Sequence, residues 1–116
     1  MPRKFMFTKD EIIFAALNIV RKNGMSALTA RALGNELGSS SKPVFSIFDN
    51  MSEVQNAVLD AANREYQGYI EEFMKSGKYP PYKASGMAYI SFAREEKELF
   101  KLLFMRETSY EKSREK

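Results

Sequence analysis

The chain has 116 residues, enough for one domain, or for one small domain with an incomplete second one. Its 44% hydrophobic and 28% charged residues are ordinary for a soluble globular protein. No apolar run approaches the ~20 residues that cross a bilayer, and the N-terminus lacks the apolar core of a secretory signal. We therefore expect a cytoplasmic protein that does not contact a membrane.

The chain contains neither cysteine nor histidine. These absences remove disulfides, thiol nucleophiles, the usual zinc ligands and the commonest general base near neutral pH. Carboxylates and lysines remain, but no spacing pairs them for catalysis. We therefore expect no enzyme, no metal site and no cofactor.

The net positive charge lies in the first 50 residues. They hold seven basic and four acidic residues, whereas the rest of the chain holds eleven of each, so the net charge of +3 belongs to the first part. Lysine and arginine neutralise phosphates and release counterions, so this placement favours a nucleic-acid partner.

A first helix is predicted over residues 8–23. Thr8 and Glu11 have the T-x-x-E spacing of a capping box, and Asn23-Gly24 stops the helix. Its apolar positions form one wide face, so we expect this helix to support the elements that follow.

Residues 29–48, TARALGNELGSSSKPVFSIF, predict two short helices joined by a tight turn. Thr29 caps the first helix, over residues 30–37. Gly38 ends it, because glycine adopts a left-handed backbone without steric cost.

The second short helix is predicted over residues 41–48, with Ser40 as its cap. Pro43 falls in its first turn, where no intrahelical N–H bond is lost. Val44 and Phe48 are expected to face the core, with Phe45 as a further candidate. This outline is typical of a helix-turn-helix, whose second helix enters the DNA major groove.

A long fourth helix is predicted over residues 51–75, opened by a second capping-box spacing at Asn50 and Glu53. Two prolines break the helical pattern at residues 76–81. Shorter helices are predicted over residues 82–94 and 97–105, and no strand pattern is present, so the chain is expected to be all-α. The predicted organisation is a DNA-binding domain, a connecting helix and a partial helical regulatory domain, at residues 1–50, 51–76 and 77–116.

Four stretches in this order resemble the TetR family of transcriptional regulators. They are IIFAALNIVRKNG (12–24), LTARALGNELG (28–38), PVFSIFDNMSEV (43–54) and SFAREEKELFKLLFM (91–105). The resemblance implies a homodimer that binds a palindromic operator, and a small-molecule effector that moves the fourth helix. It therefore implies a ligand-responsive repressor. Family members continue through further helices, so we expect this chain to be a fragment of a longer protein.

The chain departs from the family pattern at three positions. Phe45 stands where a tyrosine is usual, Met51 where a lysine is common, and Pro43 where a hydrogen-bond donor often lies. Each departure weakens the hold on phosphates. The alternative hypothesis is therefore an all-helical protein-interaction module with weakened or lost specific DNA binding.

Candidate DNA contacts cluster around the two short helices and the N-terminal arm. Hydroxyl, guanidinium and free N–H groups suit phosphates at the start of the first short helix, and serine and lysine side chains suit bases or phosphates on the second. For each residue a plain capping or solvated role is the alternative. The predicted contacts are Arg3, Lys4, Thr29, Arg31, Ser39, Ser40, Ser41, Lys42, Phe45 and Ser46.

Aromatic and methionine residues of the C-terminal part are candidates for a pocket that holds an apolar effector, because methionine adapts to varied shapes. At helical spacing the same residues also suit an ordinary core. The candidates are Met74, Tyr89, Phe92, Phe100, Phe104 and Met105.

Overall fold

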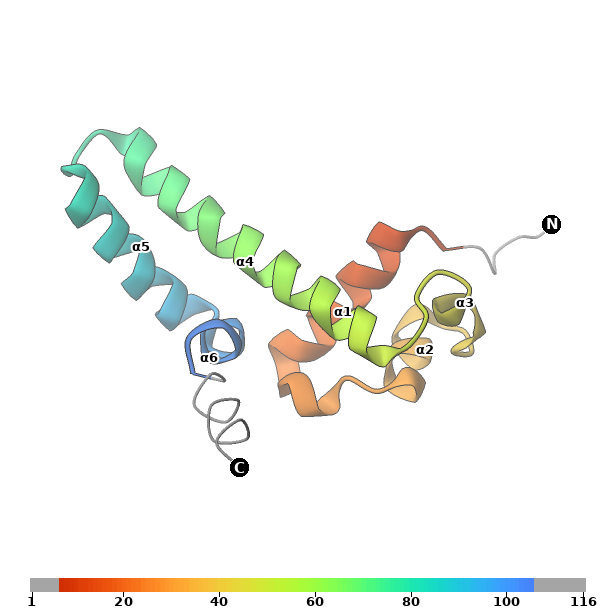
Figure 1. Cartoon of the computed structure of the whole chain (residues 1–116). Helices are drawn as coiled ribbons and strands as arrows, with labels where there is room; N and C mark the ends of the chain where they lie inside the picture. The colour runs from red at the N-terminus through yellow and green to blue at the C-terminus, as the bar shows by residue number, and fades with distance from the viewer. Residues whose placement is uncertain (1–6, 106–116) are drawn as a thin grey trace, which may run out of the picture. The chain divides into compact units, whose positions relative to one another are not determined.

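The computed structural model describes residues 7–105, and all regular secondary structure in that range is helical (Figure 1). The predicted all-α class is confirmed. None of the described helices is long and apolar enough to span a membrane. The chain divides into two compact units, Met1–Ala61 and Ala62–Lys116, and each is described by itself.

The first unit packs four helices and a single 3₁₀ turn around one core. Its elements are α1 (Lys9–Asn23), η1 (Met25–Ala27), α2 (Ala30–Leu37), α3 (Lys42–Phe45) and the beginning of α4 (Met51–Ser76). Each contributes apolar side chains at helical spacing, as the sequence pattern indicates. The side chains with no exposed surface include Ile12, Ala16, Val20, Leu33, Val44, Val54 and Val58.

Helix α1 begins and ends as its sequence predicts. The Thr8 hydroxyl accepts the Glu11 N–H at 3.0 Å, and the Glu11 carboxylate accepts the Thr8 N–H at 2.9 Å, which completes the capping box. At the other end the Gly24 N–H donates to the Val20 carbonyl at 2.8 Å, with φ at 87°. Side chains would be strained at this φ, so glycine is the residue that stops the helix.

Helix α4 runs without interruption over Met51–Ser76, and the division between the units falls inside it. The Asn50 side chain accepts the Glu53 N–H at 3.0 Å. The Glu53 carboxylate accepts the N–H of Asp49 at 2.9 Å, one residue before the predicted partner. The side chains of Asn50 and Glu53 therefore each accept a backbone N–H at the start of α4.

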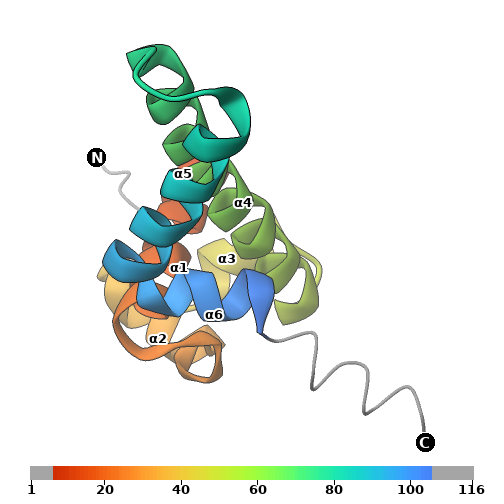
Figure 2. The same cartoon turned by 90° about the vertical axis from the view of Figure 1, so that its left-hand side faces the viewer.

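The second unit contains the rest of α4, α5 (Pro81–Glu95) and α6 (Lys97–Phe104). Helices α4 and α5 run antiparallel through a short connection in which Gly77 has φ 71°, and α6 crosses the end of α5 steeply (Figure 2). The Phe92 ring is fully buried, with centroids 5.1 Å from Tyr66 and 5.4 Å from Tyr69. Aromatic packing on Phe92 therefore joins α4 to α5.

Candidate nucleic-acid interface

The turn that follows α2 is a Schellman motif. The Gly38 N–H donates to the Asn35 carbonyl at 3.0 Å, and the Ser39 N–H donates to the Gly34 carbonyl at 2.8 Å. Gly38 has φ 73° and ψ 34°, the left-handed conformation that its sequence position predicts. Two otherwise unsatisfied carbonyls are thereby bonded, and the direction of the chain into α3 is fixed.

Gly34 lets this turn lie directly on α2. A Cβ atom at Gly34 would stand 2.9 Å from the carbonyl carbon of Ser40 and 3.0 Å from the carbonyl oxygens of Ser39 and Ser40. Gly34 is a buried residue inside α2. Glycine destabilises the interior of a helix, and here the close approach of the turn accounts for its presence. This role of Gly34 was not among the predictions from the sequence. A glycine inside a strong helical pattern is the signal that could have indicated a close approach.

The start of α3 is held by a serine and a proline. The Ser40 hydroxyl accepts the Lys42 N–H at 3.2 Å, whereas Ser41 makes no capping bond through its side chain. Pro43 lies in the first turn, as predicted. Ser40 therefore does the capping, although the helix begins one residue later than expected.

Helix α3 is shorter than the predicted span of 41–48. Its regular part ends at Phe45, and the next residues form a tighter turn, with Ile47 N–H to Val44 carbonyl at 3.1 Å. The Ser46 hydroxyl donates to the Pro43 carbonyl at 2.7 Å and so competes with the backbone for that acceptor. The prediction of a regular helix to Phe48 was therefore wrong, for this local reason.

Burial separates an inner and an outer side of α3 and its following turn. Val44 is fully buried and Phe48 is 4% exposed, as predicted, and Phe45 and Ile47 between them are 41% and 38% exposed. Lys42 and Ser46 are also exposed. The inner pair anchors this segment to the first unit, and the other side chains are free for a partner.

The predicted contact residues of this unit lie on or beside one continuous segment, from the start of α2 to the turn after α3. Thr29, Arg31 and Ser40 are exposed, whereas Ser39 and Ser41 are half-buried. The Thr29 hydroxyl accepts the Ala32 N–H at 3.0 Å and therefore caps α2. Within residues 7–105 neither Arg31 nor Lys42 forms an ion pair, so their charges are not neutralised there. Arg3 and Lys4, the two predicted arm contacts, lie outside the described residues.

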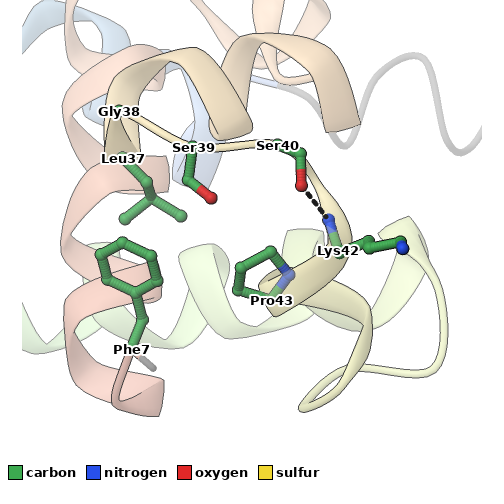
Figure 3. Close-up of a pocket in the computed structure, with 7 residues that line it drawn as sticks. All are labelled: Phe7, Leu37, Gly38, Ser39, Ser40, Lys42 and Pro43. Carbon is green, nitrogen blue, oxygen red and sulfur yellow. Dashed lines mark hydrogen bonds between the residues drawn. The ribbon is translucent and has the colours of Figure 1, made fainter. Parts of the chain in front are cut away.

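An open hollow of about 860 Å³ borders this segment (Figure 3). Phe7, Leu37 and Pro43 point into it, whereas the Lys42 side chain extends away from Phe7. The hollow is therefore mainly apolar, and the Lys42 amine points away from its apolar side.

The six predicted pocket residues of the second unit do not share a common environment. Phe92 is fully buried in the core, whereas Met74 and Met105 are 41% and 55% exposed. The Tyr89 ring packs on Phe100 and Phe104, with centroids 5.1 and 5.2 Å away. These aromatic contacts are those of a packed helix interface.

A hollow of about 310 Å³ in the second unit is lined by other residues. They are Gly68, Tyr69, Glu72, Phe73, Ser91 and Glu95. The Tyr69 hydroxyl donates to the Glu95 carboxylate at 2.7 Å. Burial, and then this hydrogen bond, raise the pKa of Tyr69 well above its ordinary value.

In the described part of the chain, no group of three or more metal-ligating side chains comes together.

Comparison with protein-family models, with curated proteins and with solved structures found no match to the chain.

Proposed function

We propose that the chain is a DNA-binding transcriptional regulator of the TetR type, with α2 and α3 as a helix-turn-helix and α3 as the helix that enters the major groove. In the same proposal it is a ligand-responsive repressor that binds a palindromic operator as a homodimer. The support comes from the geometry of the first unit and from the sequence resemblance.

The observation that carries the proposal is the two-sided construction of α3. Val44 and Phe48 hold this segment against the core, while Lys42 and Ser46 are exposed, as is Arg31 on α2. Unneutralised cations and exposed hydroxyls on one segment are what phosphate and base contacts require. The Schellman turn and the close approach at Gly34 give this surface a fixed shape.

Phe45 should contact the DNA backbone more weakly than the tyrosine that is usual in the family. Its ring is 41% exposed and can pack on a sugar, but it lacks the hydroxyl that a tyrosine would offer to a phosphate. Met51 similarly brings no charge to the start of α4. We therefore expect a modest affinity for DNA, to which Arg31 and Lys42 contribute more than Phe45 and Met51.

Helix α4 supports the effector part of the proposal. It is continuous, and it belongs to the first unit at its beginning and to the second at its end. A ligand that displaces α4 in the second unit would therefore act on an element that also belongs to the first unit. The effector itself is proposed only as a small molecule.

Operator selection tests the proposal. The full chain is used to enrich duplexes from a random DNA pool, and its affinity for the enriched duplex is compared with that for a scrambled one across several salt concentrations. We expect a palindromic sequence, tighter binding than to the scrambled duplex, and a steep fall of affinity with salt. Equal affinities and a salt slope near zero would instead favour an interaction module without DNA binding.

Lys42→Ala tests whether DNA binding depends on the charge at the start of α3 or only on the total positive charge of the chain. It should weaken binding roughly tenfold, which corresponds to about 1.4 kcal/mol, and should reduce the salt slope by about one if Lys42 contacts a phosphate. The matched control is Lys83→Ala, which removes the same charge from an exposed position on α5. An equal loss in both variants would contradict the assignment to α3.

A further inference from the structure

Ile47 is an exposed aliphatic side chain on the proposed DNA-binding surface. It is 38% exposed, and it stands between Ser46, which is exposed, and Phe48, which is buried. An exposed isoleucine needs no explanation when it stands alone on a surface. Here it follows the exposed Ser46 on the same short segment as Lys42, the segment that carries the proposed function.

The position of Ile47 is fixed by the turn that contains it. Its N–H donates to the Val44 carbonyl at 3.1 Å, and the next N–H, that of Phe48, donates to the same carbonyl at 2.9 Å. Val44 and Phe48 are both buried, so the backbone on either side of Ile47 is anchored. Its β-branched side chain has few accessible rotamers. The exposed surface of Ile47 is therefore preorganised.

The chemistry of Ile47 restricts what it can recognise on a base edge. It has no donor or acceptor, so it cannot distinguish bases by hydrogen bonds. Among the groups that base pairs present in the major groove, the C5 methyl of thymine is the apolar one. Contact with that methyl buries apolar surface on both sides and desolvates no polar atom of the side chain.

We propose that Ile47 contacts the C5 methyl of one thymine in each half of the operator and thereby sets sequence preference at that position. This inference rests on the proposed function and makes it specific. Ser46 complements it: its hydroxyl hydrogen is engaged by the Pro43 carbonyl, so the Ser46 oxygen is left as a hydrogen-bond acceptor.

Uracil substitution tests the contact without altering the protein. In the enriched duplex each thymine is replaced in turn by uracil, which removes only the methyl group, and the affinity of the full chain is measured. At one thymine per half-site we expect an affinity loss of about fourfold, the factor that corresponds to burial of one methyl-sized group. The remaining thymines should tolerate the change.

Protein variants assign the effect to Ile47. Ile47→Ala should bind the thymine and uracil duplexes equally, whereas Ile47→Val, which keeps a branched side chain, should retain most of the difference. The control is Phe14→Ala, which removes a 62% exposed apolar side chain from α1 and should keep the wild-type preference.

The outcomes distinguish this inference from the proposed function. An enriched duplex without any uracil-sensitive thymine, or with a sensitivity that persists in Ile47→Ala, would overturn the inference and leave the proposed function standing. If no duplex is enriched, both fail together.

Discussion

Replacing Gly34 with alanine should displace the turn between α2 and α3. The added methyl group would lie 2.9–3.0 Å from backbone atoms of Ser39 and Ser40. Contacts this short are rarely tolerated, and the obstacle is backbone, so no flexible side chain can move aside. The turn itself must shift, and α3 must move with it.

The size of the effect follows from two opposing terms. Alanine is favoured over glycine inside a helix by about 1 kcal/mol. Overpacking a close contact costs about 1–3 kcal/mol, and a contact with backbone belongs to the upper part of that range. We therefore expect Gly34→Ala to lower the free energy of unfolding by about 1–2 kcal/mol. Asn35→Ala, at the exposed next position of α2, should raise it by a few tenths, because it has only the helix-propensity gain.

Urea unfolding of the full chain, followed by circular dichroism, compares the two variants. Hydrogen exchange adds a local measurement, because the Ser39 amide donates to the Gly34 carbonyl and should exchange faster in Gly34→Ala. If Gly34→Ala is as stable as Asn35→Ala and the Ser39 amide stays protected, the turn does not pack on α2 as described.

Three further predictions concern the core, one cap and one tyrosine. Val44→Asp buries an unpaired charge at a fully buried site and should unfold the first unit, with loss of helical circular dichroism, whereas the same change at the exposed Phe45 should not. Thr29→Ala should lower the free energy of unfolding by about 1 kcal/mol, and Thr29→Ser, which keeps the capping oxygen, should restore most of it; equal values would contradict the cap. Tyr69 has a raised pKa, so the stability it contributes is complete below the ordinary value of 10.0 and is lost as pH rises above it. The free energy of unfolding should therefore fall more steeply above pH 10.0 in the wild type than in Tyr69→Phe, and parallel curves would contradict this.

Local interactions made much of the fold predictable. The cap at Thr8, the cap at Thr29 and the left-handed Gly38 each depend on residues a few positions apart, and the structure contains all three. Proline in the first turn of α3 is equally local. Such features follow from backbone chemistry that tertiary packing here does not override.

Features that depend on which of several contacts forms were harder to predict. From the sequence, Gly34 is only a residue of low helix propensity, because the close approach of Ser39 and Ser40 is seen only in the structure. The early end of α3 depends on a hydroxyl bond that one of several serines could have made. In the second unit, helical spacing alone could not tell the buried Phe92 from the exposed Met105. The first two outcomes depend on which of several nearby contacts forms, and the burial of Phe92 depends on Tyr66 and Tyr69, which are distant in sequence.

DNA binding by the outer side of α3 and the start of α2 is tested most directly by comparing wild type with Arg31→Ala/Lys42→Ala on the enriched duplex and on its scrambled counterpart. Wild type should prefer the enriched duplex with a steep salt dependence, and the double variant should lose most of this preference while keeping its circular dichroism. A wild type that binds both duplexes equally at physiological salt would contradict it.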